Sequence, residues 1–284
     1  MPIRRYYLGC PGWGVKTWVG RLFPQGTKPT EFLTRYAEVF NTVEGNTTFY
    51  ALPTADTVLR WRDQVPDHFR FCFKFPRTIT HDKLLLDAQR EVDEFFARIS
   101  PLRTKLGTLF LQLPPRFGPE LLPRLDHFLA RLPRDFHYGV EPRHEALFDG
   151  SAADAAAIAL LRARRVDLVI MDARGLHASH SLEHADVRAR KPALPVHMRA
   201  TSTRPLVRLV PHEDFTQSRA FVDAWAQQLA TWLAEGREPY LFMHAPDDTF
   251  AAENAYAFHE RLRALADVGD LPSWPSAPRQ LALL

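Results

Sequence analysis

Residues 69–75 read Phe69-Arg70-Phe71-Cys72-Phe73-Lys74-Phe75, with phenylalanine at every second position. Alternate residues of a β-strand point to opposite faces, so one face of this strand is wholly aromatic and suited to packing under helices. The other face carries Cys72 and Lys74. Parallel strands are covered on both faces, so the pattern predicts a parallel strand with Lys74 turned toward the inside of the sheet.

Strand-like runs recur along the chain. The eight expected strands are Tyr6–Cys10, Thr42–Phe49, Phe69–Phe75, Leu106–Leu113, His137–Arg143, Asp167–Asp172, Leu206–Val210 and Tyr240–Ala245. Helical patterns with a period of about 3.6 follow all but the sixth strand, at Thr30–Phe40, Ala55–Val65, Leu84–Ile99, Glu120–Leu132, Ala152–Arg165, Phe215–Glu235 and Glu253–Leu265. This alternation predicts an α/β protein, a closed (β/α)8 TIM barrel. The competing open sheet is disfavoured because no Gly-rich phosphate loop follows the first strand.

The 284 residues suit one barrel, so residues 1–284 are expected to form a single domain. The exception to the pattern is Ala173–Pro205, where no helical stripe stands out between strands six and seven. A long irregular loop inside a compact domain is usually functional or disordered.

Composition limits the setting. The net charge of +3 and the pI near 8.9 permit an anionic ligand without demanding nucleic acid. No stretch has the roughly 18 consecutive apolar residues that a membrane helix needs, so no membrane association is expected. Residues 1–5 lead straight into a strand without a signal peptide pattern, and the two cysteines form no CxxC pair. We therefore expect a cytoplasmic protein.

Strand parity turns a set of polar residues inward, most of them near the C-terminal strand ends. They are Glu44, Asn46 and Thr48 on strand two, Lys74 on three, Gln112 on four, Glu141 and Arg143 on five, Asp172 on six, Arg208 on seven and His244 on eight. Barrel enzymes build their active sites at these ends. A plainer alternative makes Glu44 with Lys74, and Glu141 with Arg143, structural ion pairs. Because six strands contribute ionisable groups, we favour a functional pocket.

Four motifs resemble the YecE-like family, a domain of unknown function (DUF72), along nearly the whole chain. They are Gly9-Cys10-Pro11-Gly12-Trp13, Thr42-Val43-Glu44-Gly45-Asn46-Thr47-Thr48-Phe49-Tyr50, Gln112-Leu113-Pro114-Pro115-Arg116-Phe117 and Glu141-Pro142-Arg143-His144. The resemblance implies a TIM-barrel fold but no established activity. The chain departs from the family pattern at Val210-Pro211 and at Met243–Asp248, which suggests either an altered ligand preference or a weakened version of the ancestral site.

Two chemistries can be weighed from the carboxylates and histidines. Glu44 and Glu141 could flank a glycosidic bond, but Gln112 and Arg208 occupy strands four and seven, where large retaining glycosidase barrels carry their acids. A mixed metal site is the other possibility, with ligands among His81, Glu141, His144, Asp172, His244 and Asp247. The cofactor is left open, and a divalent metal is not favoured because neighbouring Arg and Lys side chains repel cations.

The remaining signal is positive charge. Lys74, Arg77, Arg143 and Arg208 surround the expected mouth, and guanidinium groups fit phosphate oxygens well. We therefore expect a hydrolase or lyase acting on a small phosphorylated or nucleic-acid-derived anionic ligand, with Glu44 or Glu141 as base and Lys74 as acid or charge stabiliser. The expected binding residues are Trp13, Asn46, Tyr50, His81, Gln112, Arg143, His144, Asp172, Arg208 and His244. The alternative is a non-catalytic module that binds nucleic acid or a partner protein.

Overall fold

The computed structural model describes residues 6–274, so the expectation about residues 1–5 lies outside the described part of the chain. Within that part, the strands are β1 (Tyr7–Gly9), β2 (Thr42–Gly45), β3 (Arg70–Phe73), β4 (Thr108–Gln112), β5 (His137–Glu141), β6 (Asp167–Asp172), β7 (Leu206–Leu209) and β8 (Tyr240–Met243). Every expected strand is present, mostly trimmed by one or two residues at its ends.

The strands form parallel ladders. Six of them pair in the order β1-β8-β7-β6-β5-β4, and β2 pairs with β3. Single parallel bridges join Phe71 to Leu106 and Lys74 to Phe110, linking β3 with β4. On the other side, the Glu44 amide donates to the Cys10 carbonyl at 3.1 Å, linking β2 with the end of β1. The α/β class with parallel strands is as expected, and the continuous ladder covers six of the eight strands.

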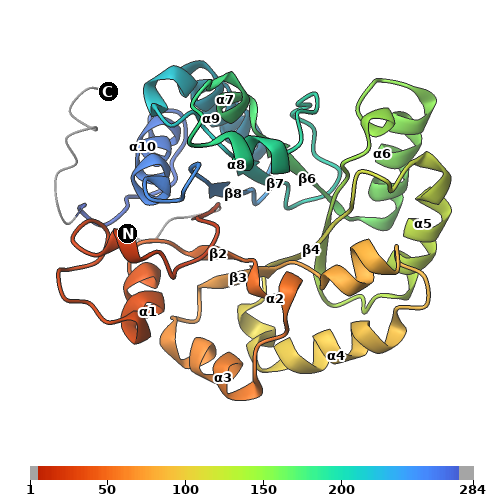
Figure 1. Ribbon diagram of the computed structural model, residues 1–284, viewed down its shortest axis with the longest axis horizontal. Helices are drawn as coiled ribbons and strands as arrows, with labels where there is room; N and C mark the ends of the chain where they lie inside the picture. The colour runs from red at the N-terminus through yellow and green to blue at the C-terminus, as the bar shows by residue number, and fades with distance from the viewer. Residues whose placement is uncertain (1–5, 275–284) are drawn as a thin grey trace.

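The larger helices lie around the strands (Figure 1). They are α1 (Phe32–Ala37), α3 (Ala55–Gln64), α4 (Gln89–Ile99), α5 (Leu122–Arg131), α6 (Ala152–Arg164), α9 (Arg219–Ala234) and α10 (Ala251–Arg263). Helix α4 shows how the sequence produces this packing, because it buries Val92, Phe95 and Ile99 as one apolar stripe. The Phe95 ring packs 4.8 Å from that of Phe75, centroid to centroid, so the aromatic face of the third strand meets a helix as predicted.

The boundary at the end of the second strand differs clearly from expectation. The second strand ends at Gly45 rather than Phe49, and the short helix α2 (Thr47–Tyr50) follows it. A Cβ at residue 45 would lie 2.4 Å from the Phe73 ring, so only glycine lets β2 approach β3 here. The Thr48 hydroxyl then donates to the Lys74 carbonyl at 2.8 Å, which fastens α2 to the end of the neighbouring strand.

The helix expected from Leu84 begins only at Gln89. A π-turn, η3 (Thr78–Asp82), precedes it, and Leu84, Leu85 and Asp87 adopt left-handed backbone conformations with φ between 48° and 66°. The Leu85 amide donates to the Ile79 carbonyl at 2.9 Å, which holds this bend against the π-turn. An apolar spacing that fits a helix is therefore built here from a turn in which only Leu85 is buried.

The Ala173–Pro205 connection is less irregular than expected. It contains α7 (Arg174–Ala178) and α8 (Ala185–Arg190), and its last part, residues 191–205, has no regular element. Helices of five and six residues are too short to display an apolar stripe, which is why the periodicity missed them. No helix within residues 6–274 has the length and apolar character needed to cross a membrane.

On the inner side of the strands lies a small apolar core of its own. It consists of Cys72, Phe110, Val169, Leu206, Tyr240 and Phe242, one or two from each contributing strand. Polar residues placed two positions further along share their direction: Lys74 follows Cys72, Arg208 follows Leu206 and His244 follows Phe242. The inner core therefore forms the floor beneath the polar cluster described next.

Candidate functional site

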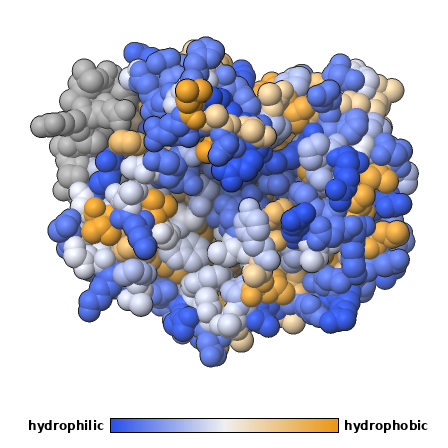
Figure 2. Space-filling view, in the orientation of Figure 1, coloured by the Kyte–Doolittle hydropathy of each residue, from blue (hydrophilic) through white to orange (hydrophobic). Residues whose placement is uncertain are grey.

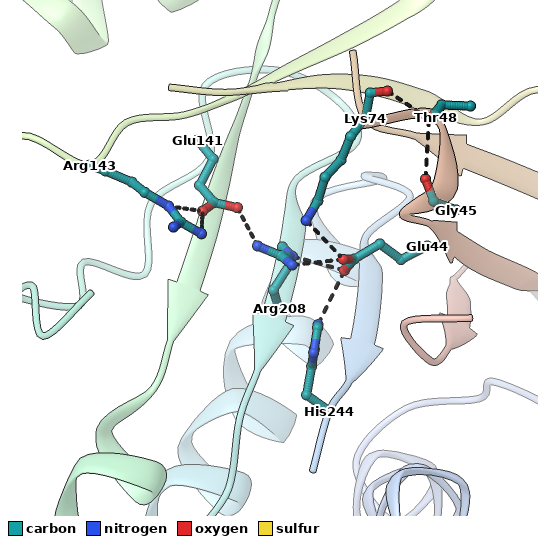
Figure 3. Close-up of polar contacts among 8 residues, drawn as sticks. All are labelled: Glu44, Gly45, Thr48, Lys74, Glu141, Arg143, Arg208 and His244. Atoms are coloured by element: carbon teal, nitrogen blue, oxygen red, sulfur yellow. Dashed lines mark hydrogen bonds and ion pairs between the residues drawn. The ribbon is translucent and has the colours of Figure 1, made fainter. Parts of the chain in front are cut away.

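Arg208 lies at the centre of a buried cluster of charges (Figure 3). Only 2% of the residue is exposed. Its Nε and Nη2 donate to the two carboxylate oxygens of Glu44 at 2.8 and 2.7 Å, and its Nη1 donates to Glu141 at 2.6 Å. A guanidinium has five N–H donors, so three are engaged by carboxylates and two remain.

Glu141 joins this arginine to a second one. Its other carboxylate oxygen accepts from Arg143 Nε at 2.7 Å. The β4–β5 register sets Gln112 directly beside Glu141, and the strand ends there because Pro142 has no amide hydrogen to donate. Arg143 lies just beyond the end of the strand, and 13% of its side chain is exposed to solvent.

Lys74 occupies the opposite side of the cluster. Its Nζ lies 3.5 Å from Glu44 Oε1, and it sits 5.9 and 5.7 Å from the ring centroids of Phe49 and Phe110. Burial lowers the pKa of Lys74 to about 7, helped by the charge of Arg208 and opposed by the two glutamates. Near neutral pH this amine is therefore present in both its protonated and its neutral forms.

The glutamates behave differently. Burial acts to raise the pKa of Glu44 and of Glu141, but the neighbouring cations outweigh it, and the pKa of Glu141 falls to about 2. Burial lowers the pKa of His244 to about 3, so this histidine is neutral at pH 7. Its Nε2 lies 3.2 Å from Glu44 and must carry the hydrogen, because an ionised carboxylate only accepts.

The charges do not balance within the cluster. Lys74, Arg143 and Arg208 supply up to three positive charges, and Glu44 with Glu141 supply two negative ones. Burial lowers the pKa of His81 to about 4, and the charges of Arg143, Arg77 and Arg116 add to that effect. Further positive charge therefore lies near this histidine. Hydrophilic side chains gather on the face of the molecule shown in Figure 2, over α8 and toward its middle.

Two other expected residues lie close to this cluster. His81 sits on η3 with its ring edge against Phe49, which itself contacts Lys74. Asn46 directly follows β2, and its Oδ1 is buried without a hydrogen-bond partner in the described part of the chain. An unpaired buried acceptor of this kind normally has a partner in the functional state of a protein.

The remaining expected binding residues make contacts outside the charge cluster. His144 caps η6 (Glu145–Leu147), accepting from the Ala146 amide. Trp13 packs edge-on against Trp61 and Phe71, on the aromatic face of β3. Tyr50 is 81% exposed and touches Phe49.

The parity expected for Asp172 is wrong. Its Oδ2 accepts from Trp225 Nε1 of α9 at 2.7 Å, and Arg174 of α7 binds the same carboxylate at the same distance. The inward residues of β6 are those in step with Val169, which belongs to the inner core, so Met171 takes the place expected for Asp172. Asp172 was expected in the site because it is charged, but the partners of its carboxylate lie in the helix layer.

Two residues near the cluster were not among the expected site residues. Phe110 presents its ring to both Lys74 and Arg208, an apolar contribution that a search for polar residues overlooks. Lys191 lies close enough for its charge to lower the pKa of both Lys74 and His244. Among residues 6–274, no three His, Cys, Asp or Glu side chains are grouped so as to hold a metal ion.

This geometry defines an α/β protein of parallel strands whose C-terminal strand ends enclose a buried ion cluster. Residues 7–279 match the family model described as protein of unknown function DUF72, and the chain belongs to that family. The resemblance to the YecE-like family is thereby confirmed.

Relatives and solved structures agree with this assignment. The UPF0759 protein YecE of Escherichia coli K12 is 44% identical over 272 residues, which cover 95% of this chain and 97% of that protein. A DUF72 family protein from Thermotoga maritima has the same fold, with a TM-score of 0.71 at 22% identity over 92% of this chain and 100% of its own. A DUF72 family protein from Enterococcus faecalis gives a TM-score of 0.68 at 16% identity over 94% of this chain and 99% of its own.

Proposed function

We propose that the eight strands act as one closed (β/α)8 barrel forming a single domain, with its functional site at the C-terminal strand ends. The bridges between β3 and β4 and the Glu44–Cys10 hydrogen bond support closure on both sides of the β2–β3 pair. The side chains of Glu44, Glu141 and Arg208, from three separate strands, meet at this end.

At this site, we infer, the protein binds a phosphate-bearing anion and acts on it as a hydrolase or lyase. The observation that carries the proposal is the excess of positive charge around Lys74, Arg143 and Arg208, buried where water screens it little. Like charges held together in this way are stabilised by an anionic ligand.

The contacts favour a division of roles. Glu44 and Glu141 stay ionised and are occupied by Arg208, so they are weak bases and serve to position that arginine. Lys74, with its pKa of about 7, is the group suited to transfer a proton. Arg143, which keeps donors free toward solvent, is suited to hold the phosphate oxygens.

A thermal-shift titration tests binding. Inorganic phosphate should raise the melting temperature of the protein in a concentration-dependent way, because a ligand that binds only the folded state stabilises it. Arg143→Met should remove most of this shift. Arg90→Met is the matched control, since Arg90 is an exposed arginine paired with Glu94 on α4, and it should keep the full shift. No shift with phosphate, sulfate or nucleotides at millimolar concentration would overturn the proposal.

Turnover separates the enzyme from a binding module. Release of inorganic phosphate from a panel of phosphate esters should be detectable with the wild-type protein, and Lys74→Met should lower that rate by about 100-fold or more. If phosphate binds but no ester on the panel is turned over, the proposed hydrolase or lyase activity is overturned in favour of the non-catalytic binding module.

A further inference from the structure

The short helix α8 lies over the C-terminal ends of β6 and β7. Its Val187 packs on a small apolar cluster formed by Ala173, Leu176 and Val210, together with Met171. Val210 directly follows β7, the strand that carries Arg208, and Met171 is the inward residue at the end of β6. Val187 thereby holds α8 against the ends of these two strands, although Ala189 and Arg190 at its far end are exposed.

The chain beyond α8 is anchored on the neighbouring strands. Pro192, Leu194 and Pro195 line a narrow pocket together with Pro142 and Met171. Pro142 lies between Glu141 and Arg143 in the sequence, so this segment covers the end of β5. Further on, Arg199 Nη2 donates to Asp154 of α6 at 2.6 Å, which ties the segment to the helix layer.

Lys191 is the residue between these two anchors. The end of α8 fixes its backbone, since its amide donates to the carbonyls of Val187 and Arg188. Its side chain is partly buried, and within residues 6–274 it forms no ion pair or hydrogen bond. Burial and the charge of Arg208 lower the pKa of Lys191 to about 8, and Glu44, Asp248 and Glu141 oppose that effect.

An unpaired ammonium beside three other cations is unfavourable unless an anion binds there. With Lys191, four cationic side chains, the other three being Lys74, Arg143 and Arg208, face three carboxylates, those of Glu44, Glu141 and Asp248. Asp248 is already held by the Ala245 amide at 3.3 Å. Counting Lys191 with Asp248 leaves the excess at one positive charge, but the Lys191 ammonium has no partner within residues 6–274 and is therefore free to bind a ligand.

We propose that α8 and residues 191–195 form a strap that delivers Lys191 to the bound phosphate, and that the preferred ligand is a phosphomonoester. This inference rests on the proposed function of the same site. A phosphomonoester carries about two negative charges near neutral pH and offers three free oxygens, whereas a phosphodiester carries one charge and offers two. A fourth cation reaching in from the strap favours the doubly charged ligand.

Binding of ethyl phosphate and diethyl phosphate, measured by calorimetry at pH 7.5, tests this assignment. The wild-type protein should bind ethyl phosphate more tightly than diethyl phosphate. Lys191→Met should weaken ethyl phosphate binding by about ten-fold, the usual size of a lost charge-assisted contact, and should change diethyl phosphate binding much less. Lys191→Arg should restore most of the loss.

The neighbouring Arg190 provides the matched control. It is exposed, and within residues 6–274 it donates only to the Asp186 carbonyl of its own helix, so Arg190→Met removes a charge from the same strap without reaching the cluster. This variant should bind ethyl phosphate as the wild type does. Lys191→Gln serves as a second variant if Lys191→Met folds poorly.

The outcomes separate the two proposals. If the wild-type protein binds neither ester nor phosphate, the proposed function fails and the strap assignment fails with it. If the wild type binds ethyl phosphate but Lys191→Met binds it equally well, or Arg190→Met loses as much affinity, only the assignment of Lys191 is overturned. Equal affinity of the wild type for the two esters would overturn the preference for a phosphomonoester.

Discussion

At the scale of single residues, Arg208 is the common partner of two buried carboxylates, Glu44 and Glu141. Each of them contacts one further cation: Glu44 lies 3.5 Å from Lys74, and Glu141 lies 2.6 Å from Arg143. An isolated buried carboxylate is costly, so the arginine serves stability as well as any ligand. A structural role in ion pairs and a role in ligand binding are therefore compatible for these residues.

Replacing Arg208 should destabilise the protein even without ligand. Arg208→Met leaves two carboxylates without their main partner, and removal of one member of a buried ion pair costs about 3–5 kcal/mol. Arg143→Met should cost much less, because Glu141 keeps its 2.6 Å contact with Arg208. Urea denaturation of both variants measures the difference, and equal losses would contradict the central role of Arg208.

The pKa of Lys74 has a consequence for stability against pH. The amine has a pKa of about 7 in the folded protein and its ordinary value of 10.5 when unfolded, so above pH 7 the unfolded state holds more protons. Stability should therefore rise from about pH 7 to 9, and Lys74→Met should flatten that rise. Lys28→Met, at an exposed site, should leave it unchanged. Above pH 9 the buried cysteines act in the opposite direction, since burial raises the pKa of Cys72 to about 12.

At the scale of elements, β6 shows how one strand serves two layers. Its inward side adds Val169 to the inner core, while Asp172 at its end faces α9 and α7. The carboxylate accepts from a buried indole and pairs with Arg174, so it joins strand to helices instead of contributing to the site.

Asp172→Ala should lower the free energy of unfolding by about 1–3 kcal/mol, because it leaves the buried Trp225 N–H without an acceptor. The phosphate-induced rise in melting temperature should be unaffected. A double-mutant cycle with Trp225→Phe measures the coupling between the two residues. A normal stability combined with a lost phosphate response would return Asp172 to the ligand site.

Much at the element scale could be predicted from alternation alone. Phenylalanine at every second position in residues 69–75 correctly turned Lys74 inward, and the same reasoning placed Arg208 and His244 on the inner side. The prediction for Asp172 was wrong because residues 168–171 of β6 are apolar on both faces, so the sequence alone does not show which face points inward. The end of β2 and the bend at residues 84–87 were not predicted. They depend on contacts with Phe73 and Ile79, which a local sequence pattern does not contain.

At the scale of the whole molecule, the proposed closure depends most on the join between β1 and β2. Few backbone bonds cross it, and the Asn41 side chain supplements them. Its Oδ1 accepts from the Leu8 amide and its Nδ2 donates to the Tyr6 carbonyl, both at 2.9 Å. The Tyr36 hydroxyl adds a further link, accepting from the Cys10 amide at 2.7 Å and donating to the Thr42 carbonyl at 2.9 Å.

Asn41→Ala should therefore weaken this join specifically. It leaves two buried backbone groups unpaired, which should lower the free energy of unfolding by roughly 2–4 kcal/mol. Hydrogen exchange should show faster exchange of the Leu8 amide, while the amides of β5 keep their protection. An unchanged Leu8 amide would mean that the two strands are held together by other contacts.

We propose that an anion binds at the C-terminal strand ends, between Lys74 and Arg143. Crystals soaked in selenate, a phosphate-like dianion with a strong anomalous signal, test it directly. We expect the highest selenium peak to lie within contact of the Lys74 ammonium and the Arg143 guanidinium, and to disappear in Arg143→Met crystals. A map with no peak there, or with its highest peaks only at surface arginines, would contradict the claim.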